Sequence, residues 1–284
     1  MDVLIRMEKV RKKYGRTVAL DEVTLDIPAG KIVGLVGPNG AGKTTMLRAL
    51  TGLISYEGDI AVLGKNPHTE RAALMEHTGV IHDVPILPQW MRVFQLMDFQ
   101  QAMHPRFSRS RCEKLLTKTS IETGRKIKHL SKGMKTQLHL SLMLATDSDI
   151  LILDEPTHGL DILFRKRFYN SVLEDYFDKE KSIIVSTHQI EEVEQILSDV
   201  IFIKEGSVLL YESVENLNKK YSQVVVPERY AQTLREYNPL AESTRIGRRV
   251  FLLEDLDAEE VREYGEVTKP ALADIFVALM GGEA

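Results

Sequence analysis

One short segment near the N-terminus combines glycines, a lysine and a hydroxyl residue at fixed spacing: Gly37-Pro38-Asn39-Gly40-Ala41-Gly42-Lys43-Thr44. It fits the P-loop pattern, in which a glycine, four residues and Gly-Lys-Thr bind phosphate groups. Glycines let the backbone curl so that several N–H groups point at phosphate oxygens, and the following helix adds the positive end of its dipole. In this pattern Lys43 reaches the β- and γ-phosphates and the Thr44 hydroxyl is placed to ligate Mg²⁺.

A site for a metal-bound phosphate also needs an acidic residue at the end of a strand. Four apolar residues, Ile150-Leu151-Ile152-Leu153, run directly into Asp154, as in the Walker B pattern, whose aspartate holds the metal ion. Glu155 follows at once, and a carboxylate beside a metal-bound γ-phosphate can polarise an attacking water as general base. The alternative interpretation of Glu155 is a solvated acid in a turn.

His188 stands at the end of another apolar run, over residues 183–187. Ligands of open α/β sheets bind at the carboxyl ends of the strands, so this histidine is placed where a ligand would lie. Considered alone, a single histidine in such a position is more often structural than catalytic.

Strand and helix signals alternate around these motifs. Residues 31–36, 150–153 and 182–186 are apolar runs typical of strands covered on both faces, and residues 44–53 and about 163–177 carry helical periodicity. Such alternation predicts right-handed crossovers and a mostly parallel sheet flanked by helices, an α/β fold.

Other parts of the chain differ from this core. Residues 3–5 and 23–27 predict strands of an N-terminal antiparallel β layer. Strand signals disappear between residues 85 and 124, which together with a helix over residues 132–145 predicts an inserted helical subdomain at about residues 85–145. Smaller strand and helix units follow, so we expect one large domain over residues 1–220 and a small C-terminal α+β extension over residues 221–284.

Composition excludes several classes of protein. With 284 residues, 43% of them hydrophobic and 27% charged, the chain is typical of globular proteins and not of disordered ones. The single cysteine, Cys112, excludes an internal disulfide and points to a reducing compartment. No apolar stretch is long enough to cross a bilayer and the first residues do not form a signal peptide, so we expect a cytoplasmic protein.

The charge is uneven along the chain. The net charge of −4 gives no general attraction for nucleic acid. Residues 104–135, however, hold ten Lys/Arg and two Asp/Glu, a local charge of +8, whereas residues 222–284 hold seven basic and twelve acidic residues, a local −5.

Together the motifs resemble those of the ATP-binding subunit of ABC transporters, of the bacterial exporter type. Leu130-Ser131-Lys132-Gly133-Met134, placed 23 residues before Asp154, is similar to the family signature Leu-Ser-Gly-Gly-Gln, with Lys132 and Met134 as departures. Ser131 and Gly133 keep a hydroxyl, backbone N–H groups and a helix N-terminus that suit a phosphate. Without the other motifs, Ser131 is an ordinary helix N-cap.

The resemblance covers roughly residues 4–216 and implies further roles. Tyr14 would stack on adenine, Gly159-Leu160-Asp161 would be the D-loop, and His188 would contact the γ-phosphate. The family's Gln loop corresponds to Gly79-Val80-Ile81-His82-Asp83, so Asp83 stands where the family has glutamine. Asp83 is either an additional Mg²⁺ ligand or a simple loop acid, and these two alternatives are about equally open.

The resemblance further implies a P-loop NTPase core and two ATP sites shared by two ATPase subunits, in a homodimer or a heterodimer. Glu155, His188 and Lys43 would be catalytic, and Thr44, Asp154 and Asp83 would bind Mg²⁺. The remaining residues expected to bind ATP are Tyr14, Gly37, Pro38, Asn39, Gly40, Ala41, Gly42 and Thr45 of one subunit, and Ser131, Lys132, Gly133, Met134 and Asp161, with the first four of these coming from the partner subunit.

Residues 269–281 are similar to the closing segment of bacterial drug- and antibiotic-exporter ATPases, which favours export. The resemblance therefore implies a separate transmembrane permease as partner, a place at the inner face of the cell membrane, and no nucleic acid. One alternative is a non-transport ABC ATPase acting on nucleic acid or ribosomes, which the basic residues 104–135 support. Another is a nucleotide-binding regulator with little turnover, suggested by Asp83, Lys132 and Met134.

Overall fold

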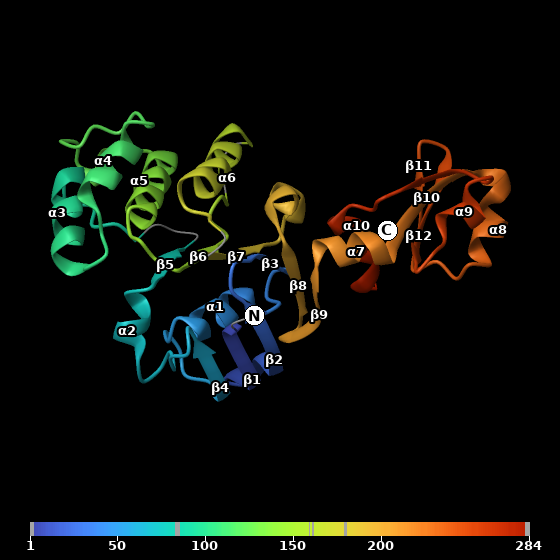
Figure 1. Cartoon of the computed structure of the whole chain (residues 1–284), viewed down its shortest axis with the longest axis horizontal. Helices are drawn as coiled ribbons and strands as arrows, with labels where there is room; N and C mark the ends of the chain where they lie inside the picture. Colours follow the sequence, from blue (N-terminus) through green and yellow to red (C-terminus); the bar gives the residue numbers. More distant parts are fainter. Residues whose placement is uncertain (1–2, 83–85, 159, 161, 179–180, 282–284) are drawn as a thin grey trace.

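The computed structural model describes residues 3–82, 86–158, 160, 162–178 and 181–281. These residues form three β-sheets with helices packed around them. The molecule is elongated, with helices of the central segment (green) near one end and the C-terminal sheet (orange and red) at the other (Figure 1).

The largest sheet has six strands in the order β5-β6-β7-β3-β8-β9. In chain order these are β3 Ile32–Val36, β5 Thr78–Ile81, β6 Ile150–Asp154, β7 Ser182–Thr187, β8 Asp199–Lys204 and β9 Ser207–Ser213. All neighbours pair in parallel except β8 and β9, which form an antiparallel hairpin. Strands β3, β6 and β7 are buried along their whole length, as their apolar sequences predict. The carboxyl ends of these three strands therefore lie side by side.

A second, antiparallel sheet has the order β2-β1-β4 and consists of β1 Val3–Tyr14, β2 Thr17–Pro28 and β4 Glu57–Val62. Its apolar side chains share one core with α1 (Lys43–Leu50) and with one face of the large sheet. The helix is thus packed between the two sheets through Met46, Leu47 and Leu50. This sheet is the predicted N-terminal layer, and its strands extend well beyond the predicted residues.

Helices replace strands in the central segment, as predicted. After the short α2 (Arg71–Met75), helices α3 (Val93–Met103), α4 (Arg109–Leu116) and α5 (Lys132–Leu144) pack on one another and on the opposite face of the large sheet, and η1 (Ile127–His129) precedes α5. Cys112 is fully buried among them, and burial raises the pKa of its thiol to about 12. Helix α6 (Ile162–Asp175) connects β6 to β7, and the short turns η2 (Ile190–Glu192) and η3 (Glu194–Ile196) precede β8.

The third sheet is antiparallel, in the order β11-β12-β10-β13, and follows α7 (Val214–Lys220). Its strands are β10 Tyr221–Pro227, β11 Ala241–Arg245, β12 Arg248–Glu254 and β13 Glu266–Thr268, with η4 Glu228–Tyr230, α8 Ala231–Arg235 and α9 Ala258–Val261 between them. One face, with Val224 and Phe251, forms a small core of its own. The opposite face, with Tyr221 and Leu252, belongs to the core of the large sheet.

The last helix, α10 (Leu272–Leu279), joins this third sheet to the rest of the chain. Its Phe276 ring packs edge-to-face on Phe202 of β8, with ring centroids 5.1 Å apart. The backbone N–H of Leu272 donates to Glu194, and Lys204 donates to the carbonyl oxygen of Met280. Among the helices that the structure describes, none combines the length and apolar character needed to span a bilayer.

We expect Phe276→Ala to lower the free energy of unfolding by about 2 kcal/mol, because the substitution removes the ring pair that holds α10 on β8. Phe99→Ala is the matched control, since Phe99 in α3 is 48% exposed. This variant should lose less than about 1 kcal/mol of the free energy of unfolding. Urea unfolding of both variants measures the difference. Equal losses would show that the Phe276–Phe202 contact does not hold the helix.

Candidate active site

The loop between β3 and α1 is closed by tight approaches to neighbouring backbone. Gly40 and Gly42 adopt left-handed φ values of +82° and +110°. A Cβ at Gly42 would lie 2.5 Å from the carbonyl oxygen of Ala19, and one at Gly37 would lie 2.4 Å from that of Ile203. Side chains do not fit at these two positions, so the glycines of the phosphate-binding pattern are required by the fold itself.

Lys43 is held inside this loop. Its side chain is only 7% exposed. The ammonium Nζ donates to the carbonyl oxygens of Gly37, at 2.7 Å, and Pro38, at 3.3 Å, and lies 3.4 Å from Glu155 Oε1. The positive charge is thus positioned over the curled backbone, where a phosphate group would be met by both N–H groups and the ammonium.

Asp154 ends β6 beneath the start of α1, and two hydroxyl groups share one of its carboxylate oxygens. Thr44 Oγ1 donates to Asp154 Oδ1 at 3.1 Å, and Ser186 Oγ donates to the same oxygen at 2.7 Å. Oxygen donors of this kind, a carboxylate and a hydroxyl, suit the hard cation Mg²⁺. The residues present therefore fit a magnesium ion, which Thr44 and Asp154 would hold. Ser186 is a member of the site that the sequence did not indicate; its signal is the pairing of Asp154 with Ser186 across β6 and β7.

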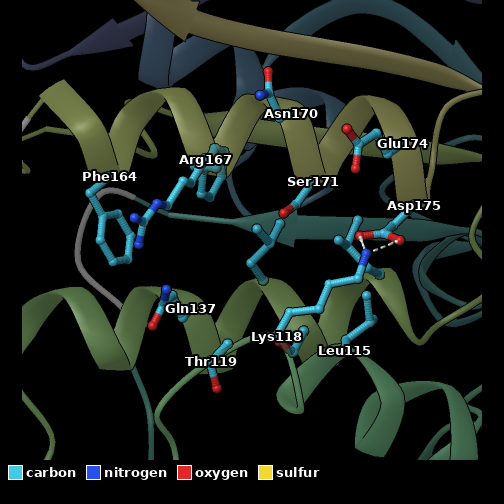
Figure 2. Close-up of a pocket in the computed structure, with 14 residues that line it drawn as sticks. Leu115, Lys118, Thr119, Gln137, Phe164, Arg167, Asn170, Ser171, Glu174 and Asp175 are labelled. Atoms are coloured by element: carbon cyan, nitrogen blue, oxygen red, sulfur yellow. Dashed lines mark hydrogen bonds and ion pairs between the residues drawn. The ribbon is translucent and has the colours of Figure 1, made fainter.

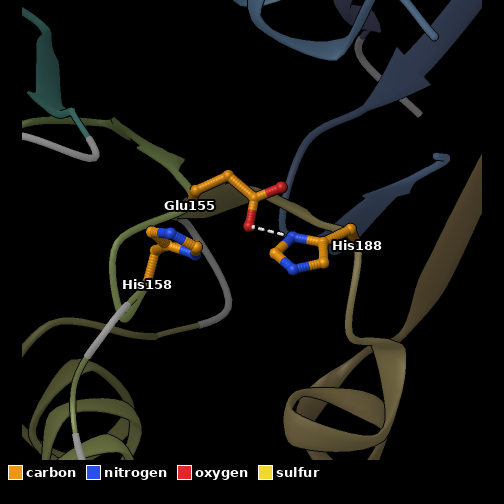
Figure 3. Close-up of side chains that lie close together, drawn as sticks. All are labelled: Glu155, His158 and His188. Carbon is orange, nitrogen blue, oxygen red and sulfur yellow. Dashed lines mark hydrogen bonds and ion pairs between the residues drawn. The ribbon is translucent and has the colours of Figure 1, made fainter. Parts of the chain in front are cut away.

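Glu155 carries the strained backbone of the site. Its φ is +47°, in the left-handed region that side chains rarely adopt. Its N–H donates to Ser186 Oγ at 3.1 Å, which helps to hold this conformation. The carboxylate lies between a histidine and a lysine. Its Oε2 is 2.8 Å from His188 Nδ1 (Figure 3), and its Oε1 is 3.4 Å from the Lys43 ammonium. Seven other non-glycine residues among those described also have positive φ, so the strain marks a fixed turn after β6 and the function of Glu155 is argued from its contacts.

A pocket of about 340 Å³ opens over these groups. It is lined by Ala19, by residues 39–45 of the loop and helix start, and by Glu155, His158 and His188. Lys43, Thr44 and Thr45 are thus brought together with Glu155 and His188. His158 is a lining residue that the sequence analysis did not single out.

The signature-like residues lie elsewhere. Ser131 caps α5, where its Oγ accepts a hydrogen bond from the N–H of Met134 at 3.2 Å. Lys132 Nζ donates to the carbonyl oxygen of His158 at 2.8 Å, and a Cβ at Gly133 would lie 3.2 Å from the Phe164 ring. None of residues 131–134 is among the described residues that line the pocket of their own chain. The N-cap role of Ser131 is therefore present, and in its own chain the first turn of α5 contacts the backbone of His158 at the rim of that pocket.

Among the described residues of the predicted set, Gly37, Pro38, Asp154 and Tyr14 are also absent from the lining of this pocket. Tyr14, at the end of β1, is 46% exposed and lies below the ammonium of Lys12, and it is absent from the described lining of the pocket. Its stacking on adenine stays a prediction. Asp83 and Asp161 lie outside the described residues, as does Gly159 of the expected D-loop.

A separate pocket of about 260 Å³ lies between helices α4, α5 and α6 (Figure 2). Lys118 spans it and contacts both carboxylate oxygens of Asp175, at 2.8 and 2.9 Å. Since its described lining contains no residue of the phosphate-binding loop, this pocket marks the contact between the helical segment and α6 and is no part of the site.

A family model and a similar protein both point to ABC transporters. A family model described as "ABC transporter" matches residues 20–158. The lantibiotic transport ATP-binding protein SrtF of Streptococcus pyogenes is 31% identical over 232 residues, which cover 80% of this chain and 99% of that protein. This chain belongs to the ATP-binding subunits of ABC transporters.

One further relative and two solved structures are also similar to this chain. The Nod factor export ATP-binding protein I of Cupriavidus pinatubonensis is 32% identical over 303 residues, covering 100% of this chain and 92% of that protein. CbiO1 from Clostridium perfringens, a part of the transporter complex CbiONQ, has a TM-score of 0.66 at 26% identity and covers 76% of this chain and 91% of its own. A solved ATP-binding subunit of an ABC transporter has a TM-score of 0.69 at 22% identity, covering 76% and 92%.

Membership in this family confirms the predicted fold class and the predicted enzyme class. The six-stranded sheet, the antiparallel layer and the helices between them form the ABC ATPase fold. The ABC ATPase binds ATP and hydrolyses it in a reaction coupled to transport.

The glycine geometry predicts different costs at two neighbouring positions. Gly40→Ala meets only the left-handed φ and should destabilise the nucleotide-free ABC ATPase by about 1 kcal/mol. Gly42→Ala adds the clash with the Ala19 carbonyl, so we expect about 3 kcal/mol. Denaturant unfolding without nucleotide compares the two variants. A Gly42→Ala protein as stable as Gly40→Ala would contradict the close approach of the loop to β2.

Proposed function

We propose that this ABC ATPase powers an exporter, and that it hydrolyses ATP at sites shared by two ATPase subunits. The observation that carries the catalytic part is the position of Glu155. Its carboxylate lies 2.8 Å from His188 and 3.4 Å from Lys43, and it directly follows Asp154, which accepts from Thr44. These groups together meet the needs of phosphoryl transfer to water.

In the proposed mechanism, backbone N–H groups of residues 39–45 and the Lys43 ammonium bind the phosphates of ATP. Mg²⁺ held by Thr44 and Asp154 would neutralise charge on the β- and γ-phosphates. Glu155 accepts a proton from the attacking water, the new bond forms to the γ-phosphorus, and the bond to the ADP oxygen breaks. His188, through its contact with Glu155 Oε2, orients that carboxylate.

A second subunit would complete each site. The N-terminus of α5, with Ser131 and Gly133, lies outside the pocket of its own chain but offers a serine hydroxyl and helix N–H groups, which bind anions well. In a homodimer, or in a heterodimer with a related subunit, this helix end would meet the γ-phosphate held by the partner. Closure would exclude water from the phosphates and strengthen these contacts.

Export through a membrane permease is supported by two observations. One of the relatives that match along the whole chain, the Nod factor export ATP-binding protein I, is named as an export protein, and its match includes the C-terminal residues that resemble exporter ATPases. The helical segment also exposes large apolar side chains near α3, namely Ile86, Trp90, Phe94, Phe99 and Met103. We propose that these residues contact a cytoplasmic segment of the permease and hold the ABC ATPase at the inner face of the membrane.

Some basic residues of the segment 104–135 form ion pairs within the chain. Arg106 pairs with Asp149 at 3.0 Å, Arg109 pairs with Asp98, and Lys118 pairs with Asp175. Three of the ten basic side chains are thus paired with acidic residues of the same chain, which leaves less positive charge for a nucleic acid.

Glu155→Gln should slow ATP hydrolysis by about 100-fold or more while ATP binding persists, because glutamine keeps the shape and cannot accept the proton. ATP should then accumulate in a dimer, visible by light scattering. Glu57→Gln, at an exposed acid of β4, is the control and should hydrolyse ATP normally. Equal phosphate release by the Glu155→Gln and unmodified proteins would refute the assignment of Glu155 as base.

Trp90 is the single tryptophan of the chain and is 71% exposed, so it can report on permease binding. We expect the emission of 5-hydroxytryptophan at this position to shift to shorter wavelength, and acrylamide to quench it less, when a co-purified permease in detergent is added. The label separates this signal from tryptophans of the permease. An unchanged signal in a complex that elutes together on gel filtration would place the contact elsewhere.

A further inference from the structure

Three potential metal ligands come together beside the magnesium residues. One ligand atom from each of Glu155, His158 and His188 lies within 4.8 Å of the others, and the side chains converge from two loops (Figure 3). The rings of His158 and His188 have centroids 5.7 Å apart. Hydrolysis as proposed uses Glu155 and His188 and gives no role to His158.

The fold brings these side chains together in two ways. The N–H of His158 donates to the carbonyl oxygen of Glu155 at 3.1 Å, so a tight turn after β6 returns His158 towards Glu155. Strands β6 and β7 are neighbours in parallel, with Asp154 opposite Ser186, so His188 emerges next to Glu155. Lys132 holds the turn from outside through its hydrogen bond to the carbonyl oxygen of His158.

The donor types separate two kinds of cation. Thr44 and Asp154 offer oxygen atoms only, which suits Mg²⁺. Two imidazoles and one carboxylate form the donor set that Zn²⁺ takes in open sites, where three protein ligands leave a fourth position for water. In a tetrahedral zinc site with bonds of about 2.0 to 2.1 Å, two ligand atoms lie about 3.3 Å apart. The hydrogen bond of 2.8 Å between His188 Nδ1 and Glu155 Oε2 must therefore open slightly for both atoms to bind one ion. His158 is exposed, so its side chain can rotate to close the remaining distance.

Lys43 limits the strength of such a site, because its ammonium lies 3.4 Å from Glu155 Oε1 and repels a dication. Binding must therefore use the opposite oxygen, Oε2, and depend on the two histidines. Removal of one histidine should then have a large effect on affinity.

We propose that Glu155, His158 and His188 form a Zn²⁺ site whose occupation inhibits ATP hydrolysis. The ion draws the Glu155 carboxylate and the His188 ring into its coordination shell, and the carboxylate can no longer accept a proton from water. The inhibition rests on the proposed role of Glu155 as base, whereas the binding of Zn²⁺ does not.

The first experiment measures Zn²⁺ binding to the nucleotide-free full chain by calorimetry. His158→Ser should weaken the affinity about tenfold or more, since even changes around metal ligands have effects of this size. His68→Ser is the matched control. His68 is also an exposed histidine, but it lies beside Tyr56 and is not part of the proposed site. Co²⁺ in place of Zn²⁺ should give visible absorption bands that His158→Ser removes. Unchanged Zn²⁺ affinity in the His158→Ser protein would overturn the proposed site.

The second experiment measures ATP hydrolysis at saturating Mg²⁺ with increasing Zn²⁺, each variant being compared with its own rate without Zn²⁺. The unmodified and His68→Ser proteins should be inhibited, with recovery on adding a zinc-selective chelator. The His158→Ser protein should need about tenfold more Zn²⁺ or more for the same inhibition. Equal Zn²⁺ sensitivity of all three would overturn the inhibitory role.

The two failures can be told apart. If Glu155→Gln hydrolyses ATP normally while His158→Ser still loses Zn²⁺, the proposed catalytic base is wrong and the metal site stands. If Glu155→Gln is inactive while His158→Ser binds Zn²⁺ as tightly as the unmodified protein, the metal site is wrong and Glu155 remains the catalytic base.

Discussion

The parallel pairing of β3, β7 and β6 is the constraint on which the site depends. Strand β7 lies between the other two in the six-stranded sheet, although more than a hundred residues of sequence separate β3 from both β6 and β7. Because their hydrogen-bonded registers are fixed, the residues that follow each strand meet at one edge. Lys43 follows β3, Glu155 follows β6 and His188 follows β7. With a different strand order these three side chains would not lie within contact distance of one another.

Burial at this edge makes the polar groups depend on one another. Asp154 is nearly excluded from solvent, and a buried carboxylate is costly unless it accepts hydrogen bonds. Thr44 and Ser186 provide those bonds, one from α1 and the other from β7. The same serine then accepts from the N–H of Glu155 and supports its left-handed backbone. Ser186 therefore links the candidate metal ligand to the candidate base, although its own side chain contacts neither Lys43 nor His188 in any described hydrogen bond.

Local patterns were sufficient to predict the elements that carry the chemistry. The glycine spacing of residues 37–44 and the apolar run before Asp154 depend on backbone geometry and burial, which sequence expresses directly. Ser186 and His158 could not be found in this way, because the first depends on strand register and the second on a turn of three residues. Strand β8, over Asp199–Lys204, was also not predicted, although residues 200–203 form an apolar run like those of the strands that were.

The C-terminal residues show the same limit on a larger scale. The composition shift near residue 220 predicted a separate extension, and Val224 and Phe251 do have a small core of their own. The alternation of side chains along β10 and β12, however, sends Tyr221 and Leu252 into the core of the large sheet. A boundary drawn from composition takes no account of which face of a strand each residue occupies.

The first turn of α5 contacts the residues after β6 through one departure from the family signature and one glycine that the signature keeps. Lys132 stands where the family signature has glycine, and its ammonium reaches the carbonyl oxygen of His158 in the same chain. Gly133, next to it, keeps the glycine that leaves room for the Phe164 ring at the start of α6. The first turn of α5 is therefore tied to the segment after β6 at two points. Any movement of α5 relative to the phosphate-binding loop must break the Lys132 hydrogen bond or carry the turn at His158 with it.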